Sequence, residues 1–186
     1  MSGHSKRKAR DEADRRAMEP VLRHYAASGQ AATALGEAAR YGHTDLMLEF
    51  FQAGVGVNAR DGGGCTPLML AASGGHAGAI RLLIEAGADV NARDDRNGRT
   101  PLTWLVAAKH PVRAYLEAAR LLLDAGADPN IRANDGTAAL DWAMDGRPEQ
   151  LVELLRQAGA QPGRPGGIQA DVSLDEFRTG RPRTSE

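Results

Sequence analysis

The sequence predicts an all-α fold, a solenoid of about four helix–turn–helix repeats joined by β-turn fingers. Two observations carry this prediction. A segment recurs every 33 or 34 residues, and within each copy the apolar residues have helical spacing. Self-similarity at a period of this length is the signature of a stacked repeat array. Aromatic residues make up only 4% of the chain, which favours thin, closely layered helices over a large globular core.

The copies of the segment begin and end in the same way. A threonine two positions before a leucine opens each copy, and an apolar stretch leads into a Gly-x-x-x-Asn tail. In the first two copies a pair of alanines and a Gly-His turn lie between these parts. The opening threonines are Thr33, Thr66 and Thr100. The tail asparagines are Asn58, Asn91 and Asn130.

Residues 1–31 precede the first copy and form a charged segment followed by a predicted helix at about 18–28. Val21, Leu22 and Tyr25 share one face of that helix. An end repeat of a solenoid needs one face that water tolerates, so we expect this helix to cap the stack.

The second copy shows the local logic of a repeat. Thr66 can cap a helix whose first residue is Pro67, because the missing N–H of proline costs nothing there. Apolar spacing predicts a second helix over about 77–86, and Gly87 supplies its end. A turn then leads to the next Thr-Pro-Leu. The repeat domain is expected over 32–160, with repeats at about 32–60, 61–93, 94–132 and 133–160.

Two copies depart from this pattern. The fourth is degenerate but keeps the spacing from Leu140 to Gly159, so we expect it to be the C-terminal cap. The third is five residues longer than the others, with the extra residues near 108–113, and we expect them to shape one rim of the binding surface.

Residues 161–186 are rich in Gly, Pro and Arg and are predicted to be a disordered tail. Within the tail, Ser173 to Phe177 has the spacing of a capping box. We interpret it as a transient helical turn, with docking on another protein or on the repeats as the alternatives.

Together these motifs resemble the ankyrin repeat. The second copy matches almost throughout, with Gly64-x-Thr66-Pro67-Leu68, Ala71-Ala72, Gly75-His76 and Gly87-Ala88-Asp89-Val90-Asn91-Ala92. The resemblance covers about 32–160 and implies a concave groove lined by fingers and inner helices. The histidine that commonly follows Thr-Pro-Leu in this family is replaced by Gly36, Met69, Thr103 and Asp141. Its absence implies weaker hydrogen bonding between repeats.

Composition and charge exclude several classes of function. The formal charge is −1, which gives no global field for nucleic acid or acidic lipid, and we expect neither as a partner. No run of 18 apolar residues occurs, so we predict a soluble, cytoplasmic protein. Cys65 is the only cysteine, which excludes an intrachain disulfide. The excess of 20 arginines over 3 lysines hints at a GC-rich bacterial genome.

No group of residues predicts catalysis, a cofactor or a metal. The five histidines occupy tail or repeat-equivalent positions, whereas a histidine metal site needs three converging ligands. The glycine-rich residues 61–64 lack the Lys-Ser/Thr of a phosphate loop and lie where a finger turn belongs. Acidic residues follow the basic run at 6–10 directly, which weakens its field. We expect no enzyme and no cofactor, and we interpret Cys65 as an ordinary free thiol exposed at the finger base.

The remaining features predict protein binding. Arg60, Arg93 and Arg132 each follow a tail asparagine by two positions, so we expect a ladder along one edge of the groove. Their guanidinium groups could grip the carboxylates of an acidic partner, and pairing with nearby aspartates is the open alternative. For Trp104, packing between repeats is equally open. The predicted contact residues are Arg40, Tyr41, Arg60, Arg93, Arg96, Arg99, Trp104, Lys109, His110 and Arg132.

We therefore predict a monomeric, non-catalytic module that binds a protein partner in the groove of fingers and inner helices. The alternative is an inhibitor or immunity-type protein that occludes the site of an enzyme. The two share one binding mode, and an activity assay on a captured partner separates them.

Overall fold

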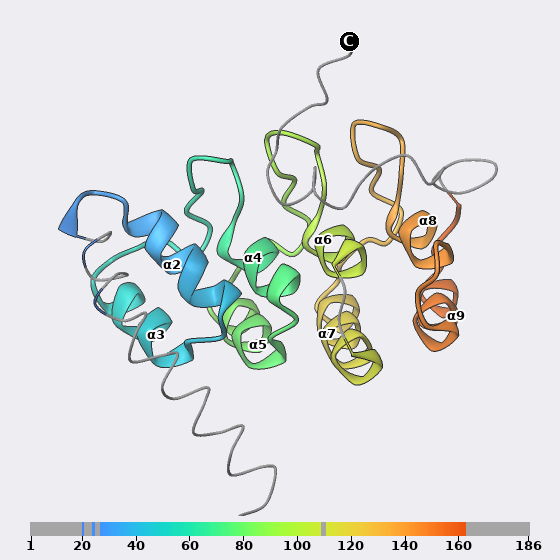
Figure 1. Cartoon of the computed structure of the whole chain (residues 1–186), viewed down its shortest axis with the longest axis horizontal. Coiled ribbons are helices and arrows are strands. Elements are labelled where there is room, and N and C mark those ends of the chain that lie inside the picture. Colours follow the sequence, from blue (N-terminus) through green and yellow to red (C-terminus); the bar gives the residue numbers. More distant parts are fainter. Residues whose placement is uncertain (1–19, 21–23, 25–26, 109–110, 163–186) are drawn as a thin grey trace, which may run out of the picture.

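The computed structural model describes residues 20, 24, 27–108 and 111–162, and it shows an elongated stack of helix pairs (Figure 1). These residues contain eight helices and no strand. The inner row consists of α2 (Ala31–Arg40), α4 (Pro67–Gly74), α6 (Pro101–Ala107) and α8 (Ala139–Met144). The outer row consists of α3 (Thr44–Gln52), α5 (Ala77–Glu85), α7 (Val112–Asp124) and α9 (Glu149–Gln157). The predicted all-α repeat solenoid is confirmed.

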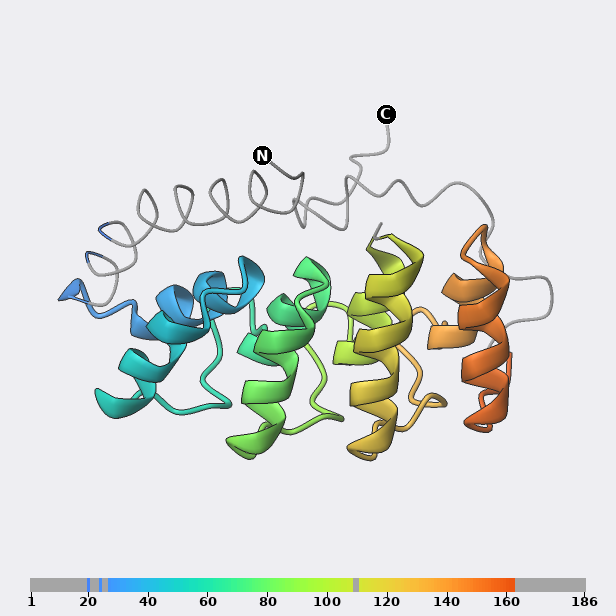
Figure 2. The same cartoon turned by 90° about the horizontal axis from the view of Figure 1, so that it is seen from below.

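Each helix contacts its partner in the repeat and its equivalent in the next repeat, as the side-by-side pairs of Figure 2 show. The finger loops before α4, α6 and α8 project from one edge of the stack (Figure 1) and are called the second, third and fourth fingers, after their repeats. The alanine pairs Ala38-Ala39 and Ala71-Ala72 are fully buried, which lets neighbouring inner helices approach closely. Leu68 and Leu102 are also fully buried and belong to the same core. One continuous core therefore runs along the stack.

The Thr-Pro starts act as the sequence predicts. The Oγ1 atom of Thr66 accepts a hydrogen bond from the backbone N–H of Met69 at 3.4 Å, and Thr100 accepts one from Thr103 at 3.4 Å. Each bond satisfies a donor that the first turn of a helix leaves open.

In the second, third and fourth repeats, the residues that stand in place of the expected histidine form hydrogen bonds at the start of their own helix. The backbone N–H of Thr66 donates to the sulfur of Met69 at 3.4 Å, and that of Ala138 donates to Oδ2 of Asp141 at 2.8 Å. In the third repeat, the hydroxyls of Thr100 and Thr103 lie 3.3 Å apart and share a hydrogen bond. Met69 and Asp141 thus accept from the backbone of the residue before the helix, whereas Thr103 bonds the side chain of that residue.

Hydrogen bonding between repeats runs through the tail asparagines. The Oδ1 atom of Asn91 accepts from the N–H of Asp128 at 2.8 Å, and its Nδ2 donates to the carbonyl of Gly126 at 3.0 Å. Asn58 makes the same pair of bonds with the second repeat, and Asn130 makes it with residues 159 and 161. The recurring Gly-x-x-x-Asn tail therefore links each repeat to the next.

The extra residues of the third repeat mostly lengthen its second helix, α7. This differs from the expectation that they shape one rim of the binding surface. α7 has 13 residues where α5 has 9. Two side chains hold the chain at this point. The Tyr115 hydroxyl donates to the carbonyl of Ala108, seven residues earlier. Arg147, from the fourth repeat, donates to the carbonyls of Val106 and Ala107, each at 2.8 Å. These contacts fix the end of α6 and the start of α7.

The two terminal predictions fall largely outside the described residues. This applies to the charged segment and capping helix within 1–31, and to the tail at 161–186.

Candidate partner-binding surface

An aspartate at the start of the second finger, and another at the start of the third, folds the finger to which it belongs. The carboxylate of Asp61 accepts from the backbone N–H groups of Gly63 at 2.8 Å and Cys65 at 2.9 Å. Asp94 does the same for Arg96 at 3.0 Å, Asn97 at 2.7 Å and Arg99 at 2.9 Å. The glycine-rich residues 61–64 are therefore a finger turn, as the sequence predicts.

Each of the three arginines of the predicted ladder forms a hydrogen bond within its own finger. Arg60 donates to the carbonyl of Gly64 at 2.8 Å, Arg93 to that of Gly98 at 3.0 Å, and Arg132 to that of Gly136 at 3.4 Å. The side chains remain exposed, but their guanidinium groups already have partners within the protein. This matches the alternative of internal pairing that the sequence left open.

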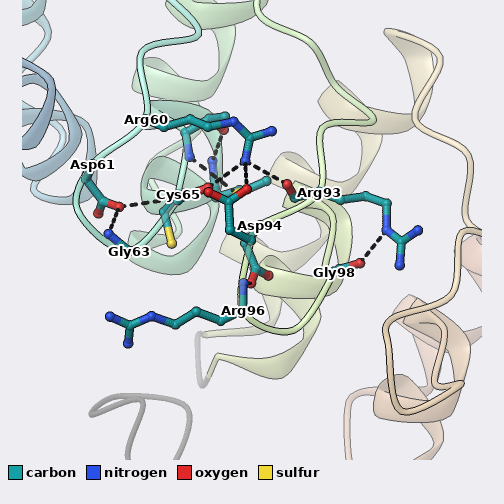
Figure 3. Close-up of polar contacts among 12 residues, drawn as sticks. Arg60, Asp61, Gly63, Cys65, Arg93, Asp94, Arg96 and Gly98 are labelled. Atoms are coloured by element: carbon teal, nitrogen blue, oxygen red, sulfur yellow. Dashed lines mark hydrogen bonds and ion pairs between the residues drawn. The ribbon is translucent and has the colours of Figure 1, made fainter.

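Two of these arginines also join one finger to the next. Arg60 donates to Oδ1 of Asp95 and to the carbonyl of Arg93, at 2.8 and 2.9 Å (Figure 3). Arg93 donates to Oδ1 of Asn134 at 3.1 Å. The second, third and fourth fingers are thereby connected along the edge.

The side chain of Arg96 differs from those of the ladder. It is exposed, and Figure 3 shows it extending away from its own finger with no interaction marked at the guanidinium group. A Cβ atom on Gly63 would lie 3.8 Å from the Cζ atom of Arg96, so the guanidinium group reaches the second finger. Among the described residues it forms no ion pair.

Arg40 lies at the end of α2 and, like Arg96, within electrostatic range of the Cys65 thiol. Its Nη1 is 3.8 Å from Oε1 of Glu37, and its buried Nε has no hydrogen-bond partner among the residues that the structure describes. Tyr41 follows with 47% of its surface exposed and its ring 6.2 Å from that of His43. The end of the first inner helix therefore carries an arginine and an exposed tyrosine at consecutive positions.

The side chains of Arg99 and Trp104 are buried, which differs from the expectation that they face a partner. Arg99 is 6% exposed, and its guanidinium carbon lies 5.0 Å from the ring of Trp142. Burial lowers the pKa of Arg99, while the carboxylates of Asp135 and Asp94 act in the opposite direction. Trp104 is 8% exposed and donates its indole N–H to Asp94 at 3.2 Å. The two buried side chains therefore help to stabilise the third finger, Trp104 through Asp94 and Arg99 through Trp142.

Cys65 lies between these groups, half-buried rather than exposed as the sequence suggested. Burial, together with the carboxylates of Asp61 and Asp94, raises the pKa of its thiol to about 12. Arg96 and Arg40 oppose this shift, so both arginines lie within electrostatic range of the thiol. A thiol in this state has almost no thiolate at neutral pH, which fits a non-reactive residue.

The last two predicted contact residues, Lys109 and His110, lie outside the described residues. The described residues contain no cluster of three or more potential metal ligands and no helix long and apolar enough to cross a membrane. Sequence reasoning missed Arg147, whose Gly-Arg-Pro context gave no signal, because its partners are the carbonyls of residues 106 and 107 in the preceding repeat.

The sequence was also compared with known proteins. A family model described as ankyrin repeats (3 copies) matches residues 35–133, more than half of the chain. The comparison with curated proteins gives no match.

Proposed function

Because this chain belongs to the ankyrin-repeat family, we propose that it binds a protein partner through its fingers and inner helices, without catalysis. Ankyrin repeats are generally protein–protein interaction modules, and the family is typically non-catalytic. The proposed surface lies on the second and third fingers and the end of α2. Its contact residues are Arg40, Tyr41 and Arg96, with the exposed Arg60, Arg93 and Arg132 along the finger edge.

The observation that carries this proposal is the contrast among the arginines. The guanidinium groups of Arg60 and Arg93 are engaged with finger backbone, whereas that of Arg96 forms no hydrogen bond with any described residue and projects from the finger (Figure 3). A charged side chain that the scaffold does not use is free to grip a ligand. Guanidinium groups bind carboxylates with two parallel hydrogen bonds, so the partner is proposed to be acidic where it contacts the surface.

The connected fingers favour binding because they are already ordered. A preformed surface loses little conformational entropy when a partner docks. Tyr41 adds a large amphipathic side chain, a type enriched among the residues that contribute most to binding energy. Lys109 and His110 remain in the proposed contact set as the neighbouring basic residues of the third repeat.

A selection from a random peptide library on the immobilised full chain tests this proposal. We expect peptides enriched in Asp and Glu, bound more weakly as salt rises, because exposed charge pairs are screened. The variant R96E should lose these peptides. The control R156E makes the same charge change on α9, outside the proposed surface, and should retain them. Enrichment of non-acidic peptides, or binding that survives R96E, rejects the proposed surface.

For a partner captured from cells, an enzymatic assay in the presence of the chain separates simple binding from inhibition. A partner whose activity falls in proportion to its occupancy makes the chain an inhibitor.

A further inference from the structure

The outer row of helices carries a groove of about 680 Å³ between α5 and α7. Val112, Leu116 and Leu121 give it an apolar floor, and Arg81, Arg113 and Arg120 contribute three guanidinium groups. These residues belong to the second helices of two neighbouring repeats. The groove is therefore separate from the finger surface.

The extended third repeat explains why the groove exists. Aligned at Gly87 and Gly126, Leu116 is equivalent to Ala77, so residues 112–115 add a helical turn without a counterpart in α5. Val112, in this turn, is 44% exposed. On the facing helix, Gly78 occupies the position equivalent to Glu117, and a Cβ atom there would meet nothing within 4 Å. The α7 side of the groove is therefore one helical turn longer than the α5 side, and the α5 side has no side chain at position 78.

The charged side chains of the groove are available to a ligand. Besides the three arginines, Glu117 and Asp124 line it. Their spacing along α7 would allow i, i+4 pairs, yet no ion pair in the described part of the chain involves a groove residue. The excess of positive charge beside an apolar floor selects a ligand with carboxylates between large apolar residues.

We propose that this groove binds the chain's own C-terminal segment, Ser173-Leu174-Asp175-Glu176-Phe177. Leu174 and Phe177 are three positions apart, so one helical turn places both on the same face. That face complements Val112, Leu116 and Leu121, while Asp175 and Glu176 complement the arginines. The capping-box spacing from Ser173 to Glu176 favours such a turn.

The tail is long enough to reach the groove. The described chain ends at residue 162, just after α9, which contacts α7, and α7 in turn contacts α5. Neighbouring helices are about 8–10 Å apart. The ten residues from 163 to 172 span up to about 33 Å. A tether of this kind gives an effective concentration in the millimolar range, so a weak contact suffices to populate the bound state.

A spin label on the tail tests the proposal in the full chain. The label is attached at T179C in a C65S background, and NMR intensities of backbone amides are compared with the label oxidised and reduced. Amides of α7 around Leu116 and Arg120, and that of Arg81, should lose most of their intensity, while those of α3 keep theirs. L174A/F177A should abolish the effect. The control I168A/V172A changes two other apolar tail residues and should preserve it.

A charge exchange makes the test specific. R113E/R120E should remove the broadening, and adding D175R/E176R to that variant should restore it. Broadening that is absent from α7, or that survives L174A/F177A, overturns the proposal. So does broadening seen when a labelled chain is mixed with an isotope-labelled unmodified chain, because a second copy then fills the groove.

Discussion

The second and third fingers begin with the same Arg-Asp pair and then diverge. In both, the arginine bonds a carbonyl across the finger and the aspartate bonds backbone N–H groups near the tip. The second finger continues with glycines, and the residue before its threonine is the small, half-buried Cys65. The third continues with charged residues, and the equivalent position holds the buried Arg99.

The two fingers also differ in how many contacts they make with other parts of the protein. The third finger contacts both neighbours: Asp95 accepts from Arg60 at 2.8 Å, and the carbonyl of Asn97 accepts from the N–H of Asn134 at 2.8 Å. It also rests on Trp104 through Asp94. The Arg-Asp pair that both fingers share therefore stabilises the fold of each finger. The third finger, with its additional contacts, carries the projecting side chain of Arg96. The following predictions test this comparison, from the largest expected effect to the smallest.

Removing the aspartate should cost far more in the third finger than in the second. D94A leaves three backbone N–H groups and the indole N–H of Trp104 without their acceptor at a buried site, and should lower the free energy of unfolding by about 2–4 kcal/mol. D61A affects two donors at a partly exposed site, and should cost about 1–2 kcal/mol. Urea unfolding measures both. Equal losses would mean that the two fingers are equally supported.

Arg147 should matter because it holds the stretched part of the third repeat. R147A removes two hydrogen bonds to carbonyls at the end of α6 and should cost about 1–3 kcal/mol. Amide exchange in α6 and in the first turn of α7 should speed up. R156A, on the exposed face of α9, should change stability by less than about 0.5 kcal/mol. A loss no greater than that of R156A contradicts the role given to Arg147.

Gly64 allows the second and third fingers to touch. Its φ is +76°, and an added Cβ atom would lie 2.2 Å from Oδ2 of Asp95. G64A should therefore cost about 1–2 kcal/mol, through backbone strain and the displaced partner of Arg60. Gly62 faces open space, so G62A serves as the control. If calorimetry gives the two variants the same unfolding temperature, Gly64 is not required for this contact.

The smallest effect near neutral pH is expected at Cys65. C65S should change stability by about 0.5 kcal/mol or less at pH 7. The folded-state pKa of the thiol is raised from 9.0 to about 12, so the folded protein holds its proton more tightly than the unfolded chain. Stability should therefore fall as pH rises from about 9 toward 12, and less so in C65S. Thiolate absorbance measures the pKa; a midpoint near 9 contradicts the buried setting.

Local signals made the repeat scaffold predictable. Thr-Pro starts, alanine pairs and glycine stops act within a few residues, so the predicted helix at 77–86 differs from α5 by one residue. The position of the extra residues was also predictable from spacing alone. Their conformation was not, because it depends on Arg147, which comes from the next repeat.

The candidate site was predictable only in part, for the same reason. Superposing the repeats placed Arg60, Arg93 and Arg132 correctly at equivalent finger positions. It could not show whether their guanidinium groups meet a carbonyl or solvent. The setting of Arg99 likewise depends on residues from another repeat, namely Trp142 and Asp135.

The most direct measurement of the central claim compares Arg60→Ala with Arg96→Ala for unfolding free energy and for affinity toward an acidic peptide selected on the wild-type chain. The account predicts that R60A lowers stability by about 1–2 kcal/mol, because Arg60 staples two fingers. R96A should leave stability unchanged and weaken the peptide about tenfold or more, the loss expected for a charge-assisted contact. Unchanged peptide affinity in R96A, with or without a change in stability, would contradict it.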